Sequence, residues 1–141
     1  MMAGAAKPIP VPNEDSEAFW RGCRAQKLVI QRCKSCGQAR FYPRIVCIAC
    51  GSTDTELFEA AGSGTVFSYT IVYRAPSPAF KSDVPYVLAI VELKEGVRMM
   101  TNIVDCEPGA VRVDMPVRVK FEQVSDEIWL PKFFPAIADN A

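Results

Sequence analysis

The second half of the chain alternates apolar and polar residues with the two-residue period of half-buried β-strands. In the first run, 65–73, this alternation would place Phe67, Tyr69 and Tyr73 on one face. Further strands are predicted at 86–93, 97–104, 111–124 and 128–135, with turn signals between them, among them Glu95-Gly96. Five strands with almost no helix predict a small closed barrel of the OB type.

The last of these strands carries Pro131 and Pro135. Proline has no backbone N–H to donate to a sheet. We therefore expect the segment 128–135 to lie at an edge or to be irregular.

The N-terminal half has a different pattern. Residues 1–12 are small and proline-rich without periodicity, which is typical of a flexible arm. Asn13 is predicted to cap a helix of about three turns, with an acidic first turn that includes Glu14 and Asp15 and an apolar side that carries Phe19 and Trp20. The fold class is thus mainly β, with an N-terminal helix.

Two cysteine pairs lie ten residues apart, CKSC at 33–36 and CIAC at 47–50. A strand at 28–31 leads into the first pair and a strand at 39–44 into the second, so the two would form a ribbon hairpin. Gly37 and Gly51 follow the pairs and permit the positive φ that turns backbone N–H groups towards thiolate sulfurs.

This spacing predicts one metal ion bound by Cys33, Cys36, Cys47 and Cys50. Four sulfurs with no open position describe a closed, structural zinc site that does not activate water. An iron centre of the rubredoxin type has the same ligand set, so the spacing leaves both metals open. Cys23 and Cys106 lie outside the pattern and are expected to be small buried side chains.

Charge and composition limit the classes of function. Sixteen basic residues balance sixteen acidic ones, so the chain of 141 residues has no net field to attract polyanions or a membrane surface. No apolar stretch is long enough to span a bilayer, and the N-terminus lacks a secretory pattern. We expect a cytoplasmic protein with reduced cysteines.

The chain contains no histidine. Histidine is the usual general base near neutral pH and the usual activator of a serine or cysteine nucleophile. Its absence argues against hydrolysis or acyl transfer carried out by this chain alone.

A zinc ribbon beside an OB barrel with aromatic residues on one strand also fits a binder of single-stranded nucleic acid, because such residues can stack on bases. These binders line their groove with basic residues, whereas no Lys or Arg occurs from Gly62 to Tyr73. The alternative is that the aromatic residues fill the barrel.

Several segments together resemble one known family. FWRGCRAQKLVIQRCKSCGQARFYPRIVCIACGS, GSGTVFSYTIVYRAP, VPYVLAIVELKEGVRMMTNIV and LPKFFP are similar to the helix, rubredoxin-like ribbon and barrel strands of the acyl-CoA-associated zinc-ribbon/OB-fold family, domain of unknown function thirty-five. The likeness runs from about residue 14 and includes Pro43-Arg44 and the GxVxS pattern that begins at Gly64. The second hook departs from the family, which often has a proline there.

The resemblance implies a non-catalytic accessory subunit of an enzyme complex that processes acyl-CoA. Members of the family associate with thiolases, with MaoC-like hydratases or with steroid side-chain aldolases, and the partner carries the chemistry. We expect a thiolase partner first and a hydratase or retro-aldolase as the alternative. The expected modules are the arm at 1–12, the helix and ribbon at 13–61 and the barrel at 62–141.

Binding of a CoA thioester, together with the partner, would need cations for its phosphates. The candidates by position are Arg40, Arg44, Arg74 and Lys81. Solvated surface charge or interface ion pairs are the alternative for each of them.

A partner interface would need bulky apolar anchors. The candidates are Phe19, Trp20, Trp129, Phe133 and Phe134, although the C-terminal ones would equally seal the barrel.

Overall fold

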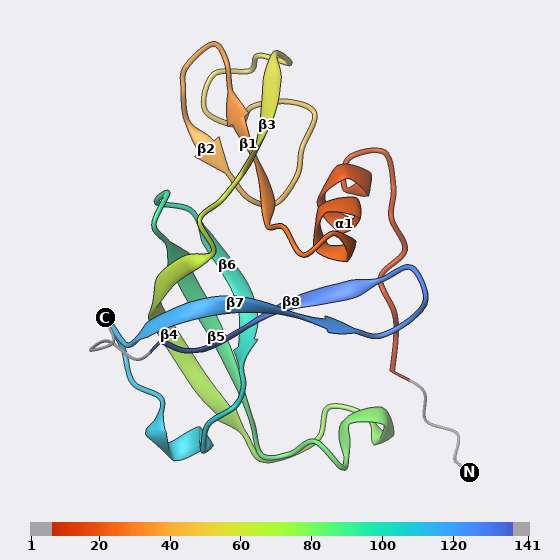
Figure 1. Cartoon of the computed structure of the whole chain (residues 1–141), viewed down its shortest axis with the longest axis vertical. Helices are drawn as coiled ribbons and strands as arrows, with labels where there is room; N and C mark the ends of the chain where they lie inside the picture. The colour runs from red at the N-terminus through yellow and green to blue at the C-terminus, as the bar shows by residue number, and fades with distance from the viewer. Residues whose placement is uncertain (1–6, 137–141) are drawn as a thin grey trace.

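A ribbon sheet and a β-barrel form the two ends of the molecule in the computed structural model, which describes residues 7–136 (Figure 1). The α-helix α1 (Glu17–Arg24) lies beside the ribbon and next to one barrel hairpin. The start of the predicted arm, 1–6, and the end of the predicted barrel module, 137–141, lie outside the described residues. No helix in residues 7–136 is long and apolar enough to cross a bilayer.

The helix α1, Glu17–Arg24, is shorter than predicted and begins later. Asn13 closes the turn that leads into it, because its Oδ1 accepts a hydrogen bond from the Ser16 N–H (2.9 Å) while Ser16 Oγ accepts one from the Asn13 N–H (3.1 Å). Glu14 and Asp15 lie in this turn and not in the helix. The Asn13 carbonyl also accepts a hydrogen bond from the Glu17 N–H (2.9 Å), so Asn13 makes the predicted side-chain cap one turn before the helix. Ser16, which directly precedes the helix, makes no side-chain capping hydrogen bond.

The helix packs closely on the ribbon. A Cβ atom at Gly22 would lie 2.6 Å from Val29 Cγ2, so only glycine permits this approach. The Phe19 ring meets the Phe41 ring edge-on, with 5.1 Å between the ring centroids. These two contacts hold α1 against the ribbon.

Three strands form the ribbon sheet in the order β2-β1-β3: β1 Val29–Cys33, β2 Ala39–Arg40 and β3 Thr55–Glu59. The predicted hairpin is therefore incomplete, because β3 pairs with the other side of β1 along its whole length. The predicted strand at 39–44 is also too long, since only two of its residues pair with β1. Residues 41–46 leave the sheet as a loop.

The barrel consists of β4 Ser63–Val72, β5 Tyr86–Leu93, β6 Arg98–Ile103, β7 Pro116–Gln123 and β8 Trp129–Pro135. It closes in the order β4-β5-β6-β8-β7, and β6 meets β8 in parallel. Short 3₁₀ turns at Pro78–Phe80 and Pro108–Ala110 lie in two of its loops. The predicted mainly β fold with a ribbon and a five-stranded OB barrel is confirmed.

The last strand is more regular than its prolines predicted. β8 pairs with β7 from Trp129 to Pro135. Its other side joins β6 at a single residue pair, Ile103 and Phe133, so few ladder hydrogen bonds are required there. The Pro131 carbonyl oxygen accepts a hydrogen bond from Thr101 Oγ1 (3.0 Å), which adds a side-chain link between β8 and β6.

A bulge between Val66 and Ser68 interrupts the alternation of β4. Val66 is fully buried and Phe67 is 42% exposed, whereas Tyr69 packs against the core. The Arg98 guanidinium lies over the Phe67 ring, 3.7 Å from its centroid. The aromatic residues predicted to share one face therefore do not form a row.

One core joins the ribbon base to the barrel. Its buried members from the first half are Phe19, Cys23, Leu28 and Ile30, and those from the barrel include Val66, Val91, Val117 and Phe133. The backbone continues this junction, because the Ala60 N–H donates to the Leu28 carbonyl (2.7 Å) and the Ala61 N–H to Glu95 Oε2 (2.8 Å).

The crossing of β4 and β5 provides a test of the barrel packing. A Cβ atom at Gly64 would collide with the Glu92 carbonyl oxygen and approach Leu93 Cα to 3.1 Å. Gly64→Ala should lower the free energy of unfolding by about 1–3 kcal/mol, because backbone atoms must move apart. Urea unfolding followed by circular dichroism measures this loss.

The matched control is Gly109→Ala, because nothing lies within 4 Å of a Cβ atom at that position. Its free energy of unfolding should change by no more than about 0.5 kcal/mol. Equal losses for the two variants would contradict the packing described for Gly64.

Candidate metal centre and the surrounding surface

The two cysteine pairs form knuckles with the same backbone geometry. The Gly37 N–H donates to the Cys33 carbonyl and the Gly51 N–H to the Cys47 carbonyl, both at 2.8 Å. Gly37 and Gly51 both have φ of +81°, as their positions after the pairs predicted. The left-handed conformation favours glycine here, although a side chain would meet no steric obstacle.

The four sulfurs have the spacing that a tetrahedral metal requires. All four Sγ atoms lie within 4.8 Å of one another. Cys33 Sγ is 3.6 Å from Cys50 Sγ, and Cys36 Sγ is 3.8 Å from Cys47 Sγ. Zinc bound at ~2.3 Å to four thiolates would place its ligands ~3.8 Å apart. The residues therefore fit a structural zinc ion, which supplies cross-linking and no open coordination position.

Backbone N–H groups of the knuckles stabilise negative charge on two of the sulfurs. The Cys36 N–H, 3.4 Å from Cys33 Sγ, is the main reason that the pKa of Cys33 is lowered to about 6. The N–H of Ala49 and then that of Cys50 lower the pKa of Cys47. At Cys50 the Ser52 N–H has the same effect, but hydrogen bonds from the other sulfurs and burial raise its pKa to about 11. A cation would offset this crowding of thiolates.

The other two cysteines have the opposite character. Burial raises the pKa of Cys23 to about 12, and burial together with the charges of Asp105 and Glu107 raises the pKa of Cys106. Cys23 belongs to the core, while Cys106 is only partly buried. Both are protonated thiols at neutral pH and poor nucleophiles.

Side chains of the ribbon sheet hold the 41–46 loop in place. Gln31 Oε1 accepts from the Arg44 N–H (2.9 Å), and Arg40 Nη2 donates to the Arg44 carbonyl (2.9 Å) and to Thr55 Oγ1 (2.8 Å). Arg40 is 7% exposed, and its Nε and Nη1 have no partner among residues 7–136. The structure therefore contradicts a CoA-binding role for Arg40, because a buried guanidinium cannot reach a ligand phosphate.

The remaining candidates for phosphate contact are exposed. Arg44 lies in the ribbon loop, and Arg74 and Lys81 lie in the loop between β4 and β5. In the described part of the chain none of the three makes an ion pair. The ribbon position is separate from the other two in the fold, so the structure does not bring the three together as one set.

Two of the five predicted interface anchors lie inside the chain's own core. Phe133 is fully buried between β6 and β7, and Phe19 is 5% exposed. For Phe133 the burial favours the alternative that this residue seals the barrel, and Phe19 likewise packs in the core. Trp20, Trp129 and Phe134 are partly buried, which leaves part of each ring at the surface.

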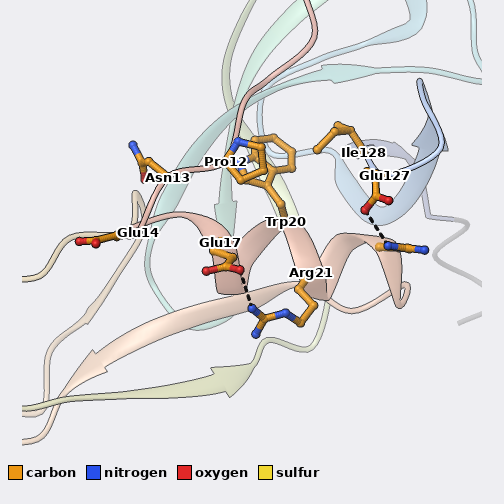
Figure 2. A pocket seen from close by; sticks show the side chains of 9 residues that line it. Pro12, Asn13, Glu14, Glu17, Trp20, Arg21, Glu127 and Ile128 are labelled. Atoms are coloured by element: carbon orange, nitrogen blue, oxygen red, sulfur yellow. Dashed lines mark hydrogen bonds and ion pairs between the residues drawn. The ribbon is translucent and has the colours of Figure 1, made fainter.

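Trp20 lies in a cavity of about 590 Å³ between α1 and the β7–β8 hairpin (Figure 2). Pro12 and Ile128 lie beside the indole, and charged side chains surround this apolar floor. The charges are largely paired, Glu17 with Arg21 (3.1 Å) and Arg24 with Glu127 (2.8 Å). The cavity therefore has an apolar centre and a polar rim, as an interface pocket has.

A second cavity, also of about 590 Å³, lies where residues 7–9 cross the barrel. Most of its lining is apolar and includes Ile9, Phe80, Tyr86 and Leu130. Its two lysines are paired, Lys7 with Asp83 and Lys132 with Glu122. This cavity is suited to an apolar group more than to a phosphate.

Sequence reasoning missed the most exposed apolar cluster. Tyr42, Ile45, Val46 and Ile48 are 49%, 56%, 47% and 75% exposed, and all lie between β2 and the end of the second knuckle. Tyr42 was missed because 39–44 was assigned to a strand. The available signal was the contrast between the apolar second knuckle, CIAC, and the polar first one, CKSC.

Comparison with known proteins agrees with this geometry. Residues 20–56 match the family model described as the ChsH2 rubredoxin-like zinc ribbon domain, and residues 58–122 match the ChsH2 C-terminal OB-fold domain. A DUF35 domain-containing scaffold protein of Methanocaldococcus jannaschii is 37% identical over 110 residues, 77% of each chain. This chain belongs to the DUF35 family.

Two further relatives of this DUF35 chain are similar in sequence. A chain of the solved structure described as Ltp2-ChsH2(DUF35) aldolase is 41% identical with a TM-score of 0.81, over 91% of this chain and 99% of that one. A probable enoyl-CoA hydratase alpha subunit of Thermomonospora curvata is 41% identical over 133 residues. The match covers 94% of this chain but only 41% of that hydratase subunit.

The metal centre gives a direct prediction. The purified protein should contain one zinc ion per chain by elemental analysis, and Cys33→Ser should lose it, because three thiolates leave the site open. Thiol titration with Ellman's reagent should detect four additional reactive cysteines after strong chelation. Iron at the same stoichiometry would identify the rubredoxin-type alternative, and unchanged thiol reactivity on chelation would contradict a metal site.

Proposed function

We propose that this chain is a non-catalytic accessory subunit of an enzyme complex that acts on CoA thioesters. The observation that carries the proposal is the 41% identity to a chain of the Ltp2-ChsH2(DUF35) aldolase over nearly all of that chain. The closed four-thiolate centre supports a structural role for the metal. The absence of histidine from the sequence supports a division of labour in which the partner supplies the acid-base chemistry.

The names of the relatives favour a hydratase or an aldolase as the catalytic partner. One relative is described as an enoyl-CoA hydratase alpha subunit and another as part of an aldolase. The thiolase that the sequence resemblance led us to expect first stays a prediction. Identification of the partner distinguishes the three classes.

Contact with the CoA thioester is proposed for the barrel cavity crossed by residues 7–9. Its apolar lining suits an acyl or pantetheine chain, and exposed Lys81 follows Phe80, which lines it. Arg74 stands at the start of the same loop. These two cations are the candidates for the CoA phosphates in the assembled complex.

The alternative of single-stranded nucleic-acid binding has little support in the fold. A stacking platform needs neighbouring exposed rings on one face. Here the bulge turns Phe67 away from Tyr69, and Arg98 already covers Phe67. We therefore retain the accessory-subunit proposal.

Affinity purification of the tagged chain from its native cells tests the proposal. A hydratase, aldolase or thiolase should be recovered in stoichiometric amount, and the purified pair should act on an acyl-CoA. The isolated chain should have no such activity. Full activity of the catalytic subunit at the same stability without this chain would contradict an accessory role.

The CoA contact has its own test in the purified complex. Arg74→Glu and Lys81→Glu should each raise KM for the acyl-CoA several-fold with little change in kcat, because the cations contribute binding and no chemistry. Arg112→Glu, an exposed cation on the loop that precedes β7, is the matched control. Equal KM for all three variants would exclude these positions.

A further inference from the structure

The two zinc knuckles allow a comparison within one molecule. Both have the same N–H to carbonyl closure at 2.8 Å and the same glycine φ of +81°. The first is also closed by the Cys33 N–H to the Gln38 carbonyl (3.0 Å) and the second by the Cys47 N–H to the Ser52 carbonyl (2.9 Å). The two knuckles therefore have the same backbone geometry around the metal centre.

The side chains of the two knuckles nevertheless differ. The first displays Lys34 and Ser35 between its cysteines, and the second displays Ile48 and Ala49 at the same positions. Ile48 is 75% exposed and Ile45, just before the knuckle, is 56% exposed. Because the polar knuckle binds the metal with the same geometry, the metal does not explain the exposed isoleucines.

The exposed apolar residues are held in a fixed arrangement. The metal centre would hold one end of the segment 41–48 through Cys47. Its middle is held at Arg44, whose N–H donates to Gln31 Oε1 and whose carbonyl accepts from Arg40 Nη2. These hydrogen bonds use only the backbone N–H and carbonyl of Arg44. Phe41 packs on Phe19 and Cys47 is buried, whereas the side chains of Tyr42, Ile45, Val46 and Ile48 are left at the surface of a preorganised segment. Such preorganisation reduces the entropy lost on binding.

The charge of Arg44 indicates which kind of surface on a partner would face the loop. Of the exposed cations in the ribbon, Arg32 pairs with Glu56 (3.8 Å) and Lys34 with Asp54 (4.0 Å). Arg44 has no acidic partner within residues 7–136. An apolar patch beside one unpaired guanidinium is complementary to an apolar surface that carries a carboxylate.

We propose that the surface formed by Tyr42, Arg44, Ile45, Val46 and Ile48, the ribbon face, is where the catalytic subunit docks. The inference rests on the proposed function, because it names the part of this chain that holds the partner. The complementary surface on that subunit is apolar and places a carboxylate opposite Arg44. Tyr42 and Arg44 are of the types that dominate interface energetics, and the isoleucines supply apolar area around them.

The test replaces the second knuckle by the first. Ile48→Lys with Ala49→Ser changes CIAC to CKSC, a sequence that already binds the metal in this protein, so zinc content and the thermal midpoint should stay unchanged. Binding to the enzyme recovered by the wild-type chain should weaken at least tenfold by surface plasmon resonance. Arg44→Glu should weaken it to a similar extent, and the wild-type affinity should fall with added salt.

The control is Val113→Lys, the same kind of change at a barrel residue that is 54% exposed. It should bind the enzyme as the wild type does. If the knuckle variant binds the enzyme as tightly as the wild type, or if the control loses as much affinity, the ribbon face is not the docking site. Either result would leave the proposed function intact. Failure of the wild-type chain to recover any acyl-CoA enzyme would overturn both. A wild-type chain that dimerises alone, and becomes monomeric in the knuckle variant, would assign this face to a second copy and contradict the proposal.

Discussion

Four thiolates take the place of a hydrophobic core in the outer part of the ribbon. From residue 33 to residue 54 the buried side chains are Cys33, Arg40 and Cys47, of which two are metal ligands. Arg40 contributes hydrogen bonds through Nη2 and no apolar packing of the kind that stabilises the barrel. A segment this small cannot bury enough apolar surface to offset the conformational entropy of two loops. Its shape therefore depends on the metal.

The inner part of the molecule is stabilised differently. The helix, the base of β1 and the barrel share one apolar core in which Leu28 and Ile30 pack with Val66 and Phe133. Metal binding therefore contributes to the free energy of folding mainly in the outer ribbon. This separation explains how Ile45 and Ile48 stay exposed, since the ribbon is folded by the sulfurs and does not need those side chains inside.

The sequence predicted the features that depend on local chemistry. The cysteine spacing indicated the metal centre, the glycines after each pair indicated the positive φ, and the alternation of 86–93 located β5 as the structure has it. In each case a few neighbouring residues determine the geometry. The OB topology followed from counting such strands.

The predictions from sequence were wrong or incomplete where the structure depends on contacts between residues far apart in the chain. β3 was missed because its five residues show only a weak pattern and are stabilised by pairing with β1. The bulge in β4 reverses which side chains face inward, and an alternating pattern does not reveal one extra residue. The sequence left Phe133 open between an interface anchor and a residue that seals the barrel, because only closure against β6 turns it inward. Arg40 was taken for a surface cation because the loop that covers it was assigned to a strand.

The junction between ribbon and barrel completes the argument for a scaffolding role. Glu95 Oε2 accepts the Ala61 N–H, and Ala60 donates to Leu28, so the chain passes between the two parts without a free linker. The ribbon face and the barrel cavity therefore keep a fixed relation to each other. When a partner contacts both surfaces, the ribbon and the barrel do not need to be ordered relative to each other. The affinity is therefore not reduced by a loss of interdomain entropy. Rigid positioning of the proposed partner relative to the barrel cavity is a role that this fold is able to provide.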